Sequence, residues 1–181
     1  MKIRLIDPAY DHPFSSHSQK VIKTIWFAHL TLTTLAALTP KDVEVEITDE
    51  NVEPIDFEED VDLVGVTGMV MHASRAYEIA ASFRRRGIPV VMGGPHASSL
   101  PFEAKEHVDA VVIGEAEMVW EGLIEDLKKG SLKPFYKADT FCSMKGLSPP
   151  RLDLLRKDAY MTINCVQTTR GCPYQCDFCY V

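Results

Sequence analysis

The sequence predicts an open α/β protein with a doubly wound parallel sheet. Within residues 1–133, short apolar segments alternate with longer segments whose apolar residues recur at helical spacing. Most of the short segments are nearly continuous runs of valine, isoleucine and leucine, as in parallel strands that helices cover on both faces. Strands joined by helical crossovers pair in parallel with right-handed connections, which places helices on both sides of one sheet.

The first half of this region predicts three strands and one helix. Residues 2–7 (KIRLID) form an apolar segment that ends at a proline-containing loop. Residues 20–38 place isoleucine, alanine and leucine at helical spacing, although their threonines lower the helix propensity. Residues 43–48 (VEVEIT) alternate like a half-buried strand at a sheet edge. Residues 61–67 (VDLVGVT) predict a central strand, because the run is apolar on both faces.

The second half predicts two more strands and three helices. Residues 72–86 carry the i, i+3, i+4, i+7 apolar spacing of a helix with one buried face. Residues 88–92 (IPVVM) and 109–113 (DAVVI) predict buried strands, and residues 100–107 predict a short helix between them. Residues 120–127 predict the last helix. The whole order predicts a Rossmann-like, flavodoxin-like sheet.

The pattern changes after this region. Residues 134–160 contain several prolines and no sustained periodicity, which predicts a linker. Residues 161–168 (MTINCVQT) predict a new strand that leads into a cysteine-rich end. We therefore expect three parts: a domain at 1–133, a linker at 134–160, and the start of a second, truncated domain at 161–181.

The composition narrows the class of protein. The chain has 181 residues, 46% of them hydrophobic and 25% charged, as in ordinary globular proteins. Its formal charge of −7 argues against nucleic acid or an anionic membrane as the partner. No segment reaches the ~18 apolar residues that span a bilayer, and the charged start is no signal peptide. Five cysteines, three of them within the last ten residues, favour a reducing cytoplasm and a metal or redox site over disulfides.

Three glycine-rich loops follow predicted strands. Parallel strands end at one edge of the sheet, where a ligand binds in this fold class. Glycine lets a ligand approach the backbone closely, although each loop alone could be ordinary turn chemistry. His72 and His96 lie near these loops, and His96 could face the ligand. The loop residues are Thr67, Gly68 and Met69, then Gly93, Gly94 and Pro95, and finally Gly114 and Glu115.

The cysteine-rich end has the chemistry of a metal site. Cys172, Cys176 and Cys179 follow the spacing C-x3-C-x2-C, which lets one loop wrap one iron–sulfur cluster. Three thiolates leave the fourth iron of such a cluster open to another ligand. The alternative is zinc, with Cys165 or a histidine as the fourth ligand. Zinc loops more often use paired C-x2-C elements, and the sequence has no second pair, so the spacing favours the cluster.

The segment RGCPYQCDFC, Arg170 to Cys179, resembles the signature of the radical S-adenosylmethionine (SAM) enzymes. It includes Phe178, the aromatic residue that usually precedes the third cysteine. The resemblance implies a [4Fe–4S] cluster on Cys172, Cys176 and Cys179, with SAM chelating the open iron. It also implies a 5′-deoxyadenosyl radical that abstracts a hydrogen atom from the substrate, since the cofactors supply the difficult chemistry.

The preceding domain resembles the cobalamin-binding domain found before the barrel of some radical SAM enzymes. The matching segments are VGVTGMVMHASRA from Val64, VVMGGPHASSLP from Val90 and VVIGEAE from Val111. The resemblance implies that the three glycine-rich loops contact the corrin ring and its nucleotide tail. Residues 7–13 lack the D-x-H-x-x-G pattern whose histidine binds cobalt in many such domains. We therefore expect base-off cobalamin with no histidine ligand.

Taken together, these resemblances identify the chain as part of a cobalamin-dependent radical SAM enzyme. They imply methyl transfer to an unactivated carbon, or an anaerobic oxidative ring closure as in the magnesium-protoporphyrin monomethyl ester cyclase. We expect residues 1–181 to be truncated and inactive alone, with no catalytic residue, because a missing barrel would hold the small-molecule, lipid or tetrapyrrole-like substrate. The alternative is a non-catalytic binding or docking module that does not bind cobalamin.

Overall fold

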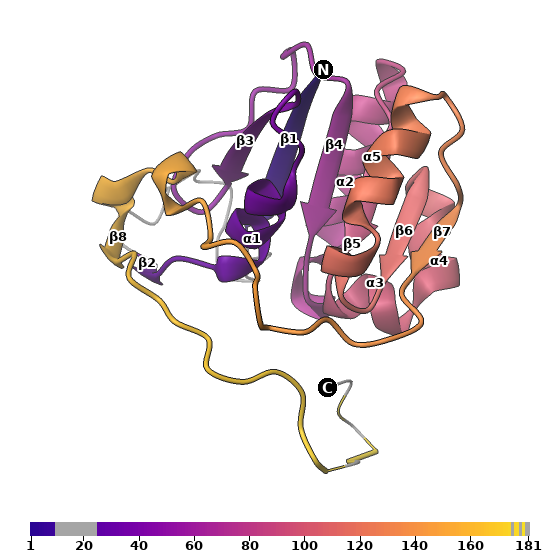
Figure 1. The fold of residues 1–181 in the computed structure, drawn as a ribbon. Helices are drawn as coiled ribbons and strands as arrows, with labels where there is room; N and C mark the ends of the chain where they lie inside the picture. The colour runs from indigo at the N-terminus through magenta and orange to yellow at the C-terminus, as the bar shows by residue number, and fades with distance from the viewer. Residues whose placement is uncertain (10–24, 175, 178, 180–181) are drawn as a thin grey trace.

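A computed structural model of the chain describes residues 1–9, 25–174, 176–177 and 179, so the first residues of the helix predicted at 20–38 lie outside the described part. Six strands form one parallel sheet in the order β3-β1-β4-β5-β6-β7 (Figure 1). This order confirms the predicted doubly wound sheet. The strands are β1 (Lys2–Asp7), β3 (Glu44–Asp49), β4 (Leu63–Thr67), β5 (Val90–Gly93), β6 (Ala110–Ile113) and β7 (Phe135–Lys137).

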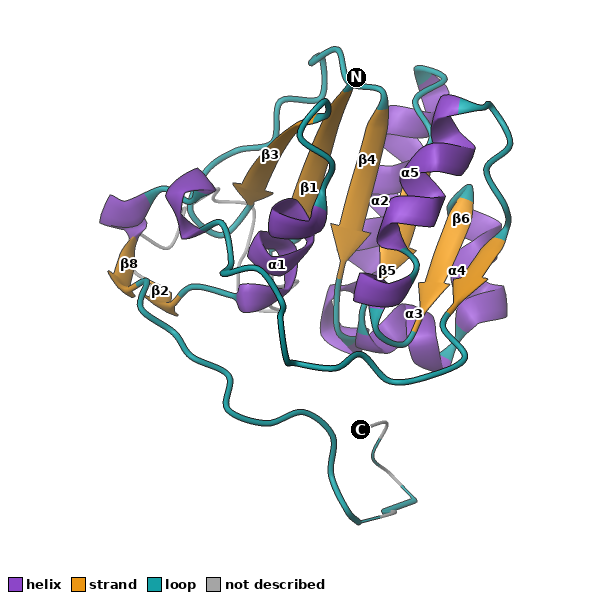
Figure 2. Ribbon diagram, in the orientation of Figure 1, coloured by secondary structure: helices purple, strands orange, loops and turns teal. Residues whose placement is uncertain are grey.

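Helices cover both faces of the sheet (Figure 2). Along β4, Leu63 points to one hydrophobic core and Val64 and Val66 point to the other, as the alternation of a strand requires. Helices α1 (Leu30–Leu38) and α5 (Trp120–Lys128) close the first core. Helices α2 (Ala73–Arg85), α3 (Pro95–Ser99) and α4 (Pro101–His107) close the second. Both faces of the central strands are therefore buried, as their apolar runs predicted.

The strand order reverses between β1 and β4. The chain passes from β1 outward to the edge strand β3, then returns across β1 to begin β4 and continues toward β7. Crossovers on opposite sides of this point leave a crevice beyond the carboxyl ends of β1 and β4. The fold therefore places its natural ligand position beside Asp7 and Thr67, the last residues of these two strands.

Two predicted elements differ from the structure. The predicted helix at 20–38 contains strand β2 (Ile25–Phe27) and becomes helical only at Leu30, because His29 has an extended backbone. Strand β2 pairs in parallel with β8 (Tyr160–Thr162). A strand was predicted at 161–168, and β8 is the part of it that forms. Both strands, Ile25–Phe27 and Tyr160–Thr162, consist mainly of β-branched and aromatic residues, which suit a short strand better than a helix.

The region expected to be a linker, residues 134–160, carries regular structure. Strand β7 pairs with β6, and the short 3-10 helices Leu152–Leu154 and Lys157–Ala159 precede β8. Leu155, Ala159 and Tyr160 are buried in the core that α1 and α5 close. The region thus wraps back onto the sheet and brings the following residues to its carboxyl edge (Figure 1).

Candidate functional site

A cavity of about 660 Å³ opens at the carboxyl ends of β1, β4, β5 and β6. The structure brings the three predicted glycine-rich loops together in its wall, from strands that are neighbours in the sheet. The order of strands explains this, because every parallel strand delivers its following loop to the same edge. The wall includes Thr67, Gly68, Met69, Gly93, Gly94, Pro95, Gly114 and Glu115.

The deep part of the cavity is an apolar slot between the sheet and the helices α1 and α5. Gly65 in the middle of β4 forms part of the slot. A Cβ atom at Gly65 would lie 2.8 Å from Leu5 Cδ2 and 4.0 Å from the Trp120 ring, so glycine at this position lets Leu5 pack against the strand beside the slot. The side chains that line the slot are Leu5, Leu32, Leu35, Val91, Val112 and Trp120.

The loops after β4, β5 and β6 are tied to one another. Gly94 has φ +91°, and a Cβ atom there would lie 2.7 Å from Thr67 Oγ1, so only glycine fits this crossing of two loops. Ser98 donates its hydroxyl to the Gly94 carbonyl at 2.9 Å and accepts the Gly114 N–H at 2.9 Å. Ser98 could not be identified from the sequence, because its partners belong to two different loops.

Gly114 has open space on the side where a side chain would lie. Its φ is +79°, and no atom lies within 4 Å of the position that a Cβ would take. The backbone after β6 is therefore free to contact a flat ligand directly. That any of these loop residues contacts a cofactor stays a prediction.

A buried carboxylate and a histidine meet on the cavity wall. Asp7 ends β1 with its side chain almost fully buried, and its Oδ2 lies 2.5 Å from His29 Nδ1 at the start of α1. This hydrogen bond raises the pKa of His29 above its ordinary value, against the opposing effect of burial. His29 was not predicted as a site residue, because it lies within the segment predicted to be a helix; the acidic residue that ends the apolar segment 2–7 was the available signal.

The Asp7–His29 pair predicts a pH-dependent stability. A raised folded pKa means that the pair stabilises the fold fully below the unfolded pKa of ~6.5 and loses this effect as the pH rises through the folded value. We expect His29→Gln to remove a contribution on the order of 1 kcal/mol below pH 6, since solvent screens the half-exposed ring, and much less at pH 9. Urea unfolding at several pH values measures this difference. Asp7→Asn should also reduce the pH dependence of the free energy of unfolding. If this free energy changes with pH in the same way in the wild type and in His29→Gln, the prediction is wrong.

His72 and His96, the two histidines near the loops, have different surroundings in the structure. His72 is buried in the cavity wall, where Met69 donates its N–H to His72 Nδ1 at 3.2 Å, and burial lowers the pKa of His72. The expectation that His96 could face the ligand is wrong. Its Nε2 lies 2.7 Å from the Tyr77 hydroxyl and 3.3 Å from Glu103 Oε1, because α3 turns the ring toward α2 and α4.

The end of the chain passes across the mouth of the cavity. Cys165, Val166, Gln167 and Arg170 contribute to the wall. Arg170 Nη1 forms an ion pair with Glu117 and lies 3.4 Å from Glu115 Oε1. Glu115 also accepts the Cys142 N–H at 2.5 Å, so it joins two distant segments to the loop after β6. The pairing of Glu117 with Arg170 was not predicted, because the two residues lie far apart in the sequence.

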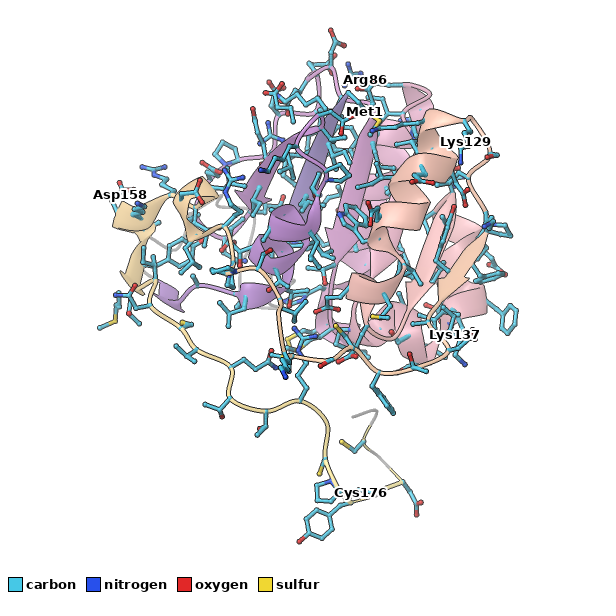
Figure 3. All side chains as sticks on the ribbon, viewed as in Figure 1. Met1, Arg86, Lys129, Lys137, Asp158 and Cys176 are labelled. Carbon is cyan, nitrogen blue, oxygen red and sulfur yellow. The ribbon has the colours of Figure 1, made fainter. Side chains whose placement is uncertain are left out.

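The three cysteines of the motif lie on the tail beyond the sheet edge, where Figure 3 labels Cys176. All three are exposed, and Cys179 donates its N–H to the Cys176 carbonyl at 2.9 Å. Within the described residues, no group of three or more cysteine, histidine or acidic side chains is gathered as a metal site. Metal binding by Cys172, Cys176 and Cys179 therefore stays a prediction. No helix in the described part of the chain has the length and apolar character needed to cross a membrane.

Comparisons with known proteins show which families the chain resembles. The sequence profile of the family described as "B12 binding domain" matches residues 28–124. The bacteriochlorophyllide d C-8(2)-methyltransferase of Chlorobaculum tepidum is 38% identical over 159 residues, which cover 83% of this chain and 35% of that protein. The C-12(1)-methyltransferase of the same organism is 34% identical, covering 83% and 34%. The hopanoid C-2 methylase of Rhodopseudomonas palustris is 27% identical, covering 82% and 29%. The chain thus spans about a third of the length of these relatives.

Proposed function

The chain belongs to the B12-binding domain family, and from this premise we propose that it carries cobalamin for a radical SAM methyltransferase. The observation that carries the proposal is the single cavity that joins an open, glycine-lined mouth to a deep apolar slot. Its volume of about 660 Å³ lies within the range of small-molecule and cofactor sites.

The residues of this cavity fit the two unlike parts of cobalamin. The corrin ring is broad and needs close backbone contact, which Gly93, Gly94 and Gly114 would supply at the mouth. The nucleotide tail ends in a flat aromatic base, which the slot beside Gly65 and Trp120 would hold. Bound methylcobalamin would supply the methyl group, and the protein would orient it and exclude water.

The proposed form of the cofactor is base-off, without a histidine ligand. A base held in the slot would be unable to bind cobalt at the mouth, so the proposed placement implies the base-off form. The absence of D-x-H-x-x-G from residues 7–13 supports the lack of a histidine ligand. His29 also lies on the wall, with its Nδ1 already bonded to Asp7.

The cysteine motif supports the radical SAM part of the proposal. Three thiols within eight residues are a donor set that suits an iron–sulfur cluster with one open iron, and such a cluster would supply an electron to SAM. A thiol-rich site of this kind belongs in a reducing cytoplasm. The relatives are bacteriochlorophyllide methyltransferases and a hopanoid methylase, which favours methyl transfer over ring closure and a tetrapyrrole or a polycyclic lipid as the substrate. The rest of the enzyme would bind that substrate.

Retention of cobalamin by the purified chain tests the proposal. The chain is mixed with methylcobalamin, passed over a desalting column, and its visible spectrum is recorded. We expect the corrin to elute with the protein at close to one equivalent and its spectrum to shift to the base-off form. A folded chain that retains no colour would refute cobalamin binding. The retained corrin could instead show a nitrogen ligand to cobalt that is lost in His29→Gln. That result would refute the proposal that no histidine binds the cobalt.

A further inference from the structure

One segment crosses the carboxyl edge of the sheet from side to side; we call this segment, residues 160–170, the strap. At its first residue, Tyr160 donates its hydroxyl to Asp49 Oδ2 at 2.8 Å, a buried bond at the end of edge strand β3. At its last residue, Arg170 pairs with Glu117 and Glu115, which follow β6. Figure 1 shows the chain that follows β8 running beyond the carboxyl ends of the strands. It is therefore anchored on both sides of the cavity.

The strap has the length that this crossing requires. Four strand spacings separate β3 from β6 in the sheet order, which amounts to about 19 Å at ~4.8 Å for each spacing. Ten residues in extended conformation reach about 33 Å, so the strap can curve over the cavity without strain. Cys165, Val166 and Gln167, in its middle, line the cavity mouth accordingly.

The two anchors are of different kinds. Tyr160 packs in the hydrophobic core as well as bonding to Asp49, so its end of the strap is held by burial. Arg170 is held by charge, through Glu117 and Glu115, whose side chains are only 10% and 24% exposed. In the described part of the chain, no hydrogen bond or ion pair joins the residues beyond Arg170 to the sheet. Among the described residues, Arg170 is therefore the last anchor before the cysteine loop.

We propose that Arg170 is a positioning residue whose ion pairs with Glu117 and Glu115 hold the cysteine loop at the mouth of the cavity. Cys172 follows Arg170 by two residues, so the anchored arginine fixes where the loop begins. A metal cluster on this loop and a corrin in the cavity would then face each other across the strap. The inference rests on the proposed function for the identity of these two groups. The ion pairs themselves can be tested in the chain without any cofactor.

Tryptic cleavage after Arg170 tests the anchor. Trypsin must bind the arginine side chain before it can cleave the peptide bond that follows. The ion pairs of Arg170 therefore protect that bond in the folded chain. We expect Glu117→Gln to speed cleavage after Arg170 about tenfold relative to cleavage after the exposed Lys145, measured by mass spectrometry. Glu121→Gln, which removes a nearby exposed carboxylate without a contact to Arg170, is the matched control and should change nothing. Equal rates in wild type and Glu117→Gln would overturn the proposal.

Alkylation of Cys165 tests the position of the strap over the cofactor. We expect hydroxocobalamin to slow the reaction of Cys165 with iodoacetamide at least fivefold in the wild type. This protection should be lost in Arg170→Gln and restored in Arg170→Lys, which a loss of general stability would not produce. Retained cobalamin without protection of Cys165 would overturn the proposed position. If the chain retains no cobalamin, the proposed function fails, and the tryptic result still decides whether Arg170 anchors the strap.

Discussion

Gly65→Val is expected to abolish the retention of cobalamin, with affinity reduced at least a hundredfold. The added side chain would fill the apolar slot where the nucleotide base is proposed to lie, because a Cβ at this position already meets Leu5 and approaches Trp120. A group that cannot enter loses its buried apolar contacts, which are worth several kcal/mol for a flat aromatic base. Desalting with methylcobalamin, followed by titration of the visible spectrum, measures the loss.

Two further variants separate blockage from misfolding. Leu35→Trp would narrow the slot from α1, where the side chain is only partly buried, and should weaken binding in the same direction. Gly122→Ala, in α5 with open space around the new Cβ, should leave binding unchanged. Circular dichroism confirms that each variant is folded. A folded Gly65→Val chain that retains cobalamin as the wild type does would show that the slot does not hold the base.

Trp120→Ala is expected to lower the free energy of unfolding by about 4 kcal/mol. Trp120 is the largest fully buried side chain among the residues whose burial the structure describes, with 2% of its surface exposed, and it packs in the core between α5 and the sheet. Its Nε1–H also donates to Thr39 Oγ1 at 3.0 Å. Truncating a buried aromatic side chain to alanine removes its apolar contacts and leaves a cavity, which costs about 3–5 kcal/mol. Urea unfolding followed by circular dichroism measures the change.

Trp120→Phe is the matched control for this prediction. It keeps an aromatic ring and removes the hydrogen bond to Thr39, so we expect a loss of about 1–2 kcal/mol. Since Trp120 also lines the slot, the alanine variant should bind cobalamin more weakly even at temperatures where it stays folded. A loss below about 1 kcal/mol for Trp120→Ala would mean that the slot and the core on this side are not packed as described.

The sheet and the three loops at its edge could be predicted because their signals are local. The apolar run at 61–67 is enough to predict a central strand, and the two glycines at 93–94 are enough to predict a turn. Parallel pairing then forces such loops to one edge, without any knowledge of which strands are neighbours. The position of the cavity follows from these facts alone.

Pairs of residues that lie far apart in the chain could not be predicted in this way. Arg170 pairs with Glu117, and His29 bonds to Asp7. Each contact joins two segments whose sequence patterns are unrelated. Strand β2 was hidden inside a helix-like pattern, because its partner β8 stabilises it from the other end of the chain. These contacts depend on tertiary packing, which overrides local propensity.

The pairing of β2 with β8 has a consequence for how the protein is made. Tyr160 reaches back 111 positions to Asp49, and its neighbours complete the core against α1. A ribosome releases the chain from its N-terminus, so α1 and β3 emerge long before the segment that covers them. Contacts of such sequence separation form late, because the closure of a long loop must precede them. The nascent domain therefore passes through a stage with this part of its core exposed, which is when a chaperone would be needed most.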